Sequence, residues 1–349
     1  MMTRALLLAG NGLYTATPNP RVGCVLTQGD TLVGEGWHEK AGGPHAEVVA
    51  IDQAGSRAAG ATMYVNLEPC SHQGRTPPCV DFIKKNRISR VIAAMLDPNP
   101  QAAHGGAQLA AAGIGFEHGL LEEAARELNI GFVSRVTRGR PWVRMKIAAT
   151  LDGRTALGEG ANAGKSQWIT GPEARKDGHR WRARACAILT GIGTVKADDP
   201  RLTVRDVETP RQPLRVIVDS RLEISPQARV LEGGGALIFC AVEPEKKLKA
   251  EVQKLPNPNG KVELPRMLEE LARRGVNELH VEAGFRLNGS LLREGCVDEF
   301  LIYLNPSLLG DEAQGMVSLP GFSSLNQRIK LKITSMDRIG GDIRILARL

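Results

Sequence analysis

Aromatic residues, long apolar runs and clusters of positive charge are all scarce in this chain of 349 residues. The apolar run at residues 5–9 is too short for a signal sequence, and no run approaches the ~20 residues of a membrane-spanning helix. Aromatic residues make up 4% of the chain and no Lys/Arg run exceeds two residues, so the basic, stacking pattern of a nucleic-acid binder is missing. These absences predict a cytoplasmic protein with no membrane and no nucleic-acid partner.

Cysteine spacing and glycine motifs argue against two further classes. The six cysteines are scattered without the spacing of a disulfide framework, which indicates a reducing compartment. No Gly-x-Gly-x-x-Gly sequence is present, so a Rossmann dehydrogenase is not indicated. The net charge of +7 permits nucleic-acid binding, but a phosphorylated metabolite, with about two negative charges per phosphate, explains it equally well, and we favour the metabolite.

Residues 44–79 carry the pattern around which the chain is organised. One imidazole, His45, and two thiols, Cys70 and Cys79, are the usual three protein ligands of a catalytic zinc whose fourth position holds water. Glu47 follows His45 by two positions on an expected helix, so its carboxylate should lie beside the metal water and not on the metal. The pattern therefore predicts a zinc site with Glu47 as the proton shuttle, and His-x-Glu followed by Pro-Cys is a known signature of zinc deaminases.

A structural zinc site, or a pair of buried free cysteines, is the main alternative. A closed site needs a fourth protein ligand, which His72 could supply. We favour the catalytic site, because a closed one leaves the nearby carboxylate without a role. Eight residues separate Cys70 from Cys79, where nucleobase and tRNA deaminases usually have two. The stiff Pro77-Pro78 pair should present Cys79 at the start of a helix, whose positive end favours a thiolate.

The sequence Glu-Pro-Cys-Ser-His-Gln-Gly-Arg-Thr-Pro-Pro-Cys at 68–79 strongly resembles the deaminase half of the bifunctional deaminase/reductases of riboflavin biosynthesis. The resemblance extends over essentially the whole chain and implies a cytidine-deaminase-like three-layer α/β/α domain at residues 1–140. Asn19, between two prolines, could by itself be either a substrate ligand or part of a turn. The segment 17–25 is typical of this deaminase group, which favours a hydrogen bond from Asn19 to the pyrimidine.

A basic break containing Pro and Gly, at residues 137–141, predicts the domain boundary. Beyond it strands alternate with helices, as in a layered α/β sheet. The resemblance implies that residues 141–349 form a dihydrofolate-reductase-like α/β domain that uses NADPH. The implied NADPH contacts are Ala148, Trp168, Thr194, Asp198, Ser220, Gly284, Phe285, Arg286, Leu287, Asn288, Gly289 and Ser290. The implied substrate contacts are Ser166, Arg182, Leu202, Arg205 and Glu282.

Several of these second-half residues have simpler explanations. Without the resemblance, Arg182 and Arg205 would be interpreted as a solvated face and Trp168 as core packing. The turn at Gly191-Ile192-Gly193 is weak evidence for a phosphate site. The Gly/Ala-rich run 158–164 is either a mobile lid or a tolerated insertion.

One turn bears on the choice of cofactor. Ser220 and Arg221 follow an expected strand, where dinucleotide ribose groups are often bound. Both could contact the 2′-phosphate of NADP. Arg221 could equally be a solvated loop residue.

Local patterns predict the following elements. In the first half, strands are expected at 22–26, 31–37, 61–67, 91–95 and 114–117, and helices at 4–12, 45–54, 80–86, 104–112 and 121–134. In the second half, strands are expected at 142–149, 185–190, 214–218, 237–240, 279–282, 300–304, 329–336 and 343–348, and helices at 265–274 and 286–293.

The sequence as a whole predicts a bifunctional zinc- and NADPH-dependent enzyme of riboflavin biosynthesis. It would hydrolytically deaminate 2,5-diamino-6-(5-phosphoribosylamino)pyrimidin-4-one and then reduce the ribosyl group to ribityl. A homo-oligomer, dimer or tetramer, is expected. The alternatives are a nucleic-acid (tRNA) base deaminase with an accessory nucleotide-binding domain and a non-catalytic nucleotide sensor, and the intact zinc pattern argues against the sensor.

Overall fold

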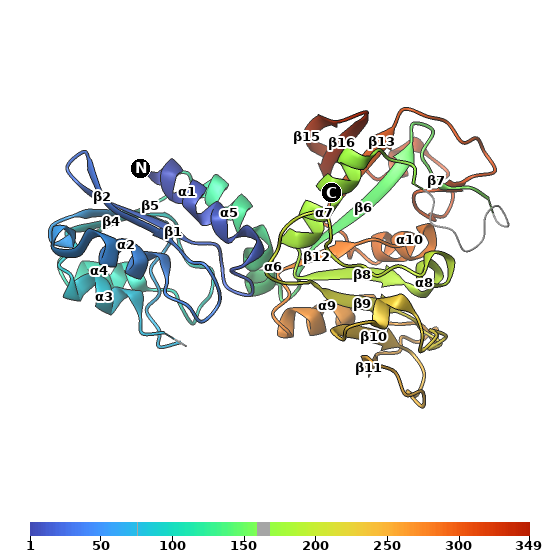
Figure 1. Cartoon of the computed structure of the whole chain (residues 1–349), viewed down its shortest axis with the longest axis horizontal. Helices are drawn as coiled ribbons and strands as arrows, with labels where there is room; N and C mark the ends of the chain where they lie inside the picture. The colour runs from blue at the N-terminus through green and yellow to red at the C-terminus, as the bar shows by residue number, and fades with distance from the viewer. Residues whose placement is uncertain (75, 159–167) are drawn as a thin grey trace. The chain divides into compact units, whose positions relative to one another are not determined.

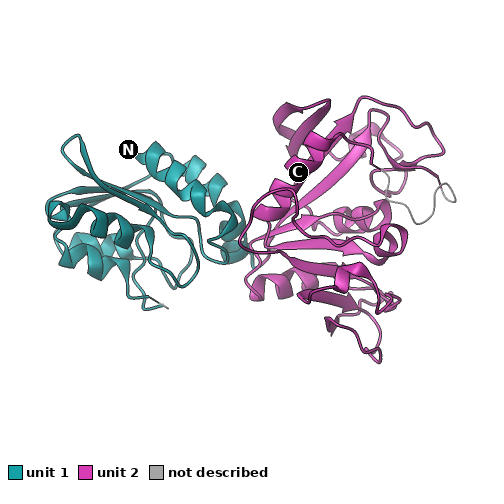
Figure 2. Ribbon diagram, in the orientation of Figure 1, with its two compact units in different colours: residues 1–139 teal, residues 140–349 magenta. Residues whose placement is uncertain are grey.

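The structure, a computed structural model, describes residues 1–74, 76–158 and 168–349. The chain forms two compact units, residues 1–139 and 140–349 (Figure 2), which divide one residue away from the expected boundary. Each unit has a sheet of its own (Figure 1). Within the described ranges no helix combines the length and the apolarity that crossing a bilayer requires.

The first unit is a five-stranded sheet between two layers of helices (Figure 1). The strand order is β2-β1-β3-β4-β5, with β1 antiparallel to its two neighbours and β3, β4 and β5 parallel. The strands are β1 Gly23–Gln28, β2 Thr31–Trp37, β3 Thr62–Leu67, β4 Arg90–Met95 and β5 Gly115–His118. One face is covered by α1 Met2–Gly10 and α5 Glu122–Leu128, and the other by α2 Ala46–Ala54, α3 Cys79–Lys85 and α4 Gly105–Ala111. This arrangement confirms the expected three-layer α/β/α fold.

Two glycines of β2 let α2 lie close to the sheet. A Cβ at Gly34 would lie 2.2 Å from the carbonyl oxygen of Ala50, and one at Gly36 would lie 2.6 Å from Val49. No side chain fits in that space, because real Cβ contacts are longer. The close approach positions α2, which directly follows His45 and carries Glu47 in its first turn.

The prediction of a single helix at 121–134 is wrong, because the chain forms two helices there. Helix α5 ends at Leu128, and α6 runs over Ile130–Arg138. Between them the side chain of Asn129 accepts a hydrogen bond from the Arg21 N–H at 2.7 Å and donates one to the Arg21 carbonyl at 3.0 Å. Asn129 sits at the break with a φ of −107°, and its side-chain bonds to another segment are not visible in any local pattern.

The second unit is a nine-stranded sheet in the order β11-β10-β9-β8-β12-β6-β13-β16-β15. Every neighbouring pair from β11 across to β13 in this order is parallel. Strand β16 is antiparallel to β13, and β15 pairs antiparallel with β16, so the two close the sheet as a hairpin. The strands are β6 Trp142–Thr150, β8 Ala187–Gly191, β9 Leu214–Val218, β10 Ala236–Cys240, β11 Glu251–Lys254, β12 Glu278–Val281, β13 Glu299–Asn305, β15 Lys332–Ile339 and β16 Asp342–Arg348. A separate small sheet pairs β7 Arg154–Ala156 with β14 Gln314–Gly315.

Helices lie on both faces of this sheet (Figure 1). They are α7 Pro172–Arg184, α8 Ile192–Asp198, α9 Leu264–Arg273 and α10 Phe285–Arg293. Strand β13 shows how alternation divides the core: Phe300 packs with the residues of α9 and α10, whereas Leu301 and Tyr303 pack with Ala174 of α7. The layered α/β fold is thus confirmed for the second unit as well.

Two details of the second unit differ from the expected elements. The strand expected at 329–336 begins and ends three residues later, as β15, because the hairpin turns at Gly340, whose φ is +61°. Strand β11, Glu251–Lys254, was not expected. It is a short polar strand at the sheet edge, so it lacks the apolar run that would have marked it.

Candidate active sites

Three potential metal ligands meet beyond the carboxyl end of β3, the central strand of the first sheet. His45 immediately precedes α2, Cys70 follows β3, and Cys79 is the first residue of α3. The His45 Nδ1 atom lies 3.2 Å from Cys79 Sγ and 3.6 Å from Cys70 Sγ. A tetrahedral zinc, with ~2.0 Å to nitrogen and ~2.3 Å to sulfur, places such ligand atoms about 3.5 Å apart. The three side chains therefore fit zinc.

Neighbouring groups orient these ligands. The Thr76 hydroxyl lies 3.2 Å from His45 Nε2, which leaves Nδ1 facing the two sulfurs. The backbone N–H of Cys79 donates to Cys70 Sγ at 3.4 Å. Hydrogen bonds, first from Cys79 and then from His45, lower the pKa of Cys70, while the same contact with Cys70 raises that of Cys79. Zinc binds thiolates, so a bound metal would hold both sulfurs deprotonated.

Only these three residues form a potential metal group within the described part of the chain. His72, the ligand that a closed site would need, lines the cavity but is exposed and lies outside this group. The fourth position therefore faces the cavity, as a catalytic zinc requires.

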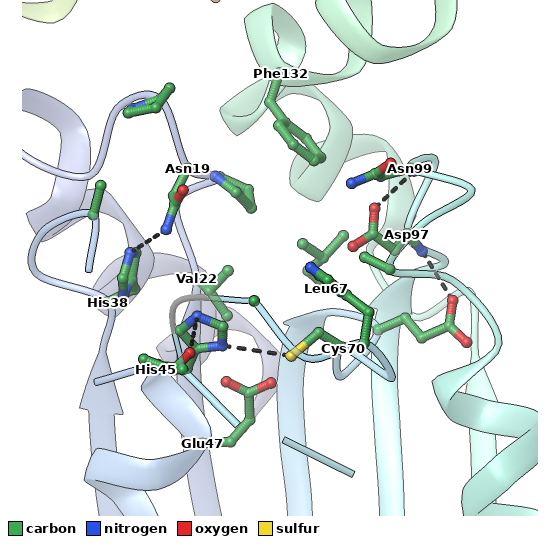
Figure 3. A pocket seen from close by; sticks show the side chains of 18 of the residues that line it. Asn19, Val22, His38, His45, Glu47, Leu67, Cys70, Asp97, Asn99 and Phe132 are labelled. Carbon is green, nitrogen blue, oxygen red and sulfur yellow. Dashed lines mark hydrogen bonds between the residues drawn. The ribbon is translucent and has the colours of Figure 1, made fainter. Parts of the chain in front are cut away.

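Glu47 lies beside the three ligands in the first turn of α2. It is 4% exposed, and its carboxylate points toward the space between His45 and Cys70 (Figure 3). Burial raises the pKa of Glu47 above its usual value. A carboxyl group next to the metal position with a raised pKa can both accept and return a proton at neutral pH.

The cavity above Glu47 has a volume of about 310 Å³ and is walled by two loops (Figure 3). On one side Asn19 Nδ2 lies 3.0 Å from His38 Nε2, and His38 Nδ1 lies 2.9 Å from the Pro44 carbonyl oxygen. Because a carbonyl only accepts, His38 carries its proton on Nδ1 and its Nε2 accepts from Asn19. The carbonyl oxygen of Asn19 then remains as an acceptor for a substrate.

Asp97 and Asn99 lie on the opposite wall, and the sequence interpretation missed both (Figure 3). Asp97 accepts the Asn99 N–H at 2.8 Å, and burial raises its pKa to about 6. Pro-Asn-Pro occurs at 18–20, 98–100 and 256–258, and the asparagines of the first two copies, Asn19 and Asn99, line this cavity, so the repeat by itself does not mark the site. Phe132 and Arg135 of α6 also line it, and nothing in their sequence context marks them.

The second unit holds a larger cavity, of about 1360 Å³, at the carboxyl ends of its parallel strands. Of the residues expected to contact NADPH, the lining includes Ala148, Trp168, Thr194, Asp198, Ser220, Gly284, Phe285, Arg286, Leu287, Asn288 and Ser290. Gly289 does not line the cavity. A Cβ there would lie 2.0 Å from the Ser318 carbonyl oxygen, so this glycine serves close packing of α10.

Four of the expected substrate contacts, Arg182, Leu202, Arg205 and Glu282, also line this cavity, whereas Ser166 lies outside the described residues. Arg182 is not on a solvated face. Its Nε and Nη2 atoms donate to the two oxygens of Glu282 at 2.5 and 2.8 Å, and its Nη1 donates to the Thr203 carbonyl at 3.0 Å. Although burial alone would raise the pKa of Glu282, Arg182 holds it well below its usual value.

Trp168 and Arg205 are more exposed. Trp168 is 66% exposed with the Arg175 guanidinium 4.9 Å from its ring, so it is not core packing. Arg205 is exposed, and its backbone N–H donates to His179 Nδ1 at 3.2 Å. Of the run at 158–164, only Gly158 lies within the described residues.

Lys146 is a cavity residue that the sequence interpretation did not select. It lies on β6, and burial lowers its pKa while the nearby Glu282 opposes that change. A buried amine beside an ion pair in a cavity is a functional candidate.

Both units match known families. Residues 1–95 match the family described as the cytidine and deoxycytidylate deaminase zinc-binding region, and residues 141–345 match the RibD C-terminal domain. The riboflavin biosynthesis protein RibD of Escherichia coli is 43% identical over 98% of this chain and 96% of its own length. The chain belongs to the RibD family. The RibD of Aquifex aeolicus is 41% identical over 99% of this chain and 96% of its own.

Solved structures agree with this assignment. Acinetobacter baumannii RibD has a TM-score of 0.92 and 40% identity, covering 99% of this chain and 97% of its own. A Thermotoga maritima protein described as a diaminohydroxyphosphoribosylaminopyrimidine deaminase and 5-amino-6-(5-phosphoribosylamino)uracil reductase has a TM-score of 0.89 and 33% identity, with the same coverage. The chain is therefore a bifunctional deaminase and reductase of riboflavin biosynthesis, and its two families imply Zn²⁺ and NADPH. The tRNA-deaminase alternative is not supported.

Proposed function

We propose that the first unit hydrolytically deaminates 2,5-diamino-6-(5-phosphoribosylamino)pyrimidin-4-one and that the second unit reduces the ribosyl group of the product to ribityl. The observation that carries the first step is the open set of His45, Cys70 and Cys79 with the buried Glu47 beside it. Zinc, when bound, supplies a water activated for attack near neutral pH. Glu47 would move one proton of that water to the ring nitrogen and then a second, from the new hydroxyl group, to the amino group, so that ammonia leaves and the C–N bond is replaced by C–O.

The walls of the first cavity are suited to a phosphorylated pyrimidine. Asn19 offers a carbonyl oxygen to the N–H groups of the ring, as the bond to His38 leaves that oxygen unused. Arg135 has the only permanent positive charge among the described residues that line the cavity, which suits a phosphate ester. Phe132 can stack on the ring.

In the second unit NADPH, when bound, supplies the hydride for C1 of the ribosyl group. The residues of α10 and of the turns after β8 and β9 would hold the cofactor at the carboxyl ends of the strands. The Arg182–Glu282 pair and Leu202 would orient the sugar beside the nicotinamide. Ser166 and Gly289 stay predictions of the resemblance, the first as a substrate contact and the second as a cofactor contact.

The decisive experiment incubates the full chain with the diaminopyrimidine phosphate and follows ammonia release and NADPH oxidation separately. Ammonia should appear without NADPH, and NADPH should be consumed only once deamination has occurred. NADPH oxidation without ammonia release would contradict the proposed order. As a test of the metal site, Cys79→Ser should lower the zinc content, and full zinc would remove this thiol from the ligand set.

The units should be separable near residue 140. Arg140 bonds Asp298 at 2.5 Å and so belongs to the second unit. A fragment that begins at Arg140 should fold and reduce the deaminated substrate with NADPH. A folded fragment without this activity would mean that the two units share a site.

The chain should form a homo-oligomer, a dimer or tetramer, in the cytoplasm, without nucleic acid. The support is the exposed edge strand β15, on which Ile333 is 53% and Met336 59% exposed. An unpaired edge with apolar side chains tends to associate. Sedimentation should show an oligomer that Met336→Lys weakens, and a monomeric wild-type chain would contradict this assignment.

A further inference from the structure

Glu68 follows β3 directly, two positions before the metal-site residue Cys70, and its carboxylate makes two backbone contacts. It is 5% exposed. Its Oε2 accepts the Asp97 N–H at 3.0 Å, and its Oε1 accepts the Gly106 N–H at 2.8 Å. Its own N–H donates to the Met95 carbonyl at 2.9 Å. Three hydrogen bonds thus join this residue to the segment 95–106.

The other side of Cys70 is joined to the same segment. The Ser71 hydroxyl lies 2.6 Å from the Ala103 carbonyl oxygen and 3.2 Å from that of Ala102. The peptide of Pro69 touches Gly105, where a Cβ would lie 1.9 Å from the Pro69 carbonyl oxygen. The turn that carries Cys70 is therefore held against residues 95–106 from both sides.

This segment forms one wall of the deaminase cavity. Asp97 and Asn99 face the cavity opposite Asn19 and His38 (Figure 3). The opposite wall has its own hydrogen bonds, from Asn19 to His38 and from His38 to Pro44. The width of the cavity at the metal ligands thus depends on how the segment 95–106 is attached to the turn of Cys70.

A carboxylate is the group that this attachment requires. Both oxygens of Glu68 accept from backbone N–H groups, whereas the amide of a glutamine has only one oxygen to accept with. An amide would turn its NH₂ group toward one of these donors and leave a buried N–H without a partner. With both oxygens in use, Glu68 is not free to act as a second proton shuttle beside Glu47.

We propose that Glu68 is a positioning residue that holds the Asp97–Asn99 wall at the correct distance from Cys70 for the pyrimidine substrate. This role rests on the proposed deamination and concerns the same cavity. Glu68 acts through the backbone of Asp97, so it affects substrate binding more than proton transfer.

The test is Glu68→Gln in the full chain, with both activities and the zinc content measured. The KM for the diaminopyrimidine phosphate should rise about tenfold or more, because a displaced wall loses contacts that bind the substrate equally in the ground state and the transition state. The kcat for ammonia release should change less than about threefold, since lost binding without lost chemistry appears in KM. Zinc content and the reductase constants should equal those of the wild-type chain.

Two further variants make the result specific. Ser89→Ala removes a hydroxyl that bonds the Gly60 and Ala61 carbonyls at the opposite end of β4, so it tests general loosening of the same sheet. It should leave the KM unchanged. Ser71→Ala loosens the same turn from its other side and should raise the KM in the same direction, by a smaller factor. If Glu68→Gln is insoluble, Ser71→Ala decides by the same criterion.

A fall in kcat at unchanged KM, a loss of zinc, or no change in either constant overturns the positioning role. An equal rise in KM for Ser89→Ala overturns it too, because the effect would then be general. If the wild-type chain releases no ammonia, the proposed function fails instead, and the two failures are thus distinguished.

Discussion

The two cavities of this chain are assembled from sequence in different ways. In the first unit, the three metal ligands and Glu47 all come from residues 45–79, around a cavity of about 310 Å³. In the second, a cavity of about 1360 Å³ has walls that extend from Lys146 to Gln314. A metal centre needs a few side chains of special type, whereas a dinucleotide site uses backbone and common side chains from many strand ends. The first site is therefore visible in a local motif and the second is not.

The cavities also differ in the state of their buried carboxyl groups. Burial raises the pKa of Glu47 in the first cavity, so this group can carry a proton. In the second, Arg182 holds Glu282 ionised despite its burial. The first site is thus equipped to move protons, and the second to hold a fixed charge beside a substrate.

The largest effect should come from Glu47→Gln. An amide cannot shuttle protons, so deamination should fall about 10²- to 10⁴-fold or more, while zinc is retained. The reductase activity of the same chain is the internal control and should not change. Ammonia release at a rate near that of the wild type would remove Glu47 from its role and with it the contrast between the cavities.

Arg182→Ala should act on the second unit alone. Removing the arginine takes two bonds from the largely buried carboxylate of Glu282 and leaves only His280 and Lys146 beside it, which should lower the free energy of unfolding of that unit by about 3 kcal/mol and abolish reduction. The control is the double variant Arg182→Met with Glu282→Gln, which should recover stability but not activity. The measurement is thermal unfolding together with both activities. Unchanged stability would show that the pair is solvated and not buried.

The two units should respond to acid in opposite directions. The folded first unit binds a proton more tightly at Asp97, whose pKa burial raises to about 6, than the unfolded chain does. Its stability should therefore fall as the pH rises from about 4 to 6, by about 3 kcal/mol. In the second unit, burial and then the charge of Arg182 lower the pKa of His179 to about 4. That unit should lose about 3 kcal/mol as the pH falls from about 6.5 to 4.

Peptide-resolved hydrogen exchange in denaturant, corrected for intrinsic rates, can follow each unit in the intact chain. Asp97→Asn should reduce the slope of the first unit only, where Glu47 also has a raised pKa, and His179→Gln should reduce that of the second only, where the pKa of His280 is also lowered by burial. Parallel slopes in the two units would contradict the assignment of either group.

The smallest effect should come from Arg221→Ala. The side chain of Arg221 is 78% exposed and pairs with Glu223 at 2.7 Å, and exposed pairs contribute at most about 1 kcal/mol. Because the guanidinium is mostly solvated and already paired, we expect it to contribute no more than about 1 kcal/mol to NADPH binding, which is less than about fivefold in the KM. A larger rise for NADPH with no change for NADH would instead place Arg221 on the 2′-phosphate, where Ser220 of the same turn could also contact it.

Most helices and strands were predictable, because their apolar periodicity is local. The break at Asn129 was not, since it depends on hydrogen bonds to Arg21, more than a hundred positions away. Strand β11 was missed because a polar edge strand has no pattern of its own. In each case the information lies in a partner distant in sequence.

The sequence alone determined the class of chemistry, because His45, Glu47, Cys70 and Cys79 have few other uses in that order. It also contained the Pro-Asn-Pro segments at 18–20 and 98–100, and a third at 256–258, without indicating which of them are neighbours in space. Only the tertiary structure brought the first two to one cavity, since Asn19 precedes β1 and Asn99 follows β4. The metal ligands are recognisable by type, whereas the walls of a cavity are defined by the order and direction of strands, which local sequence does not encode.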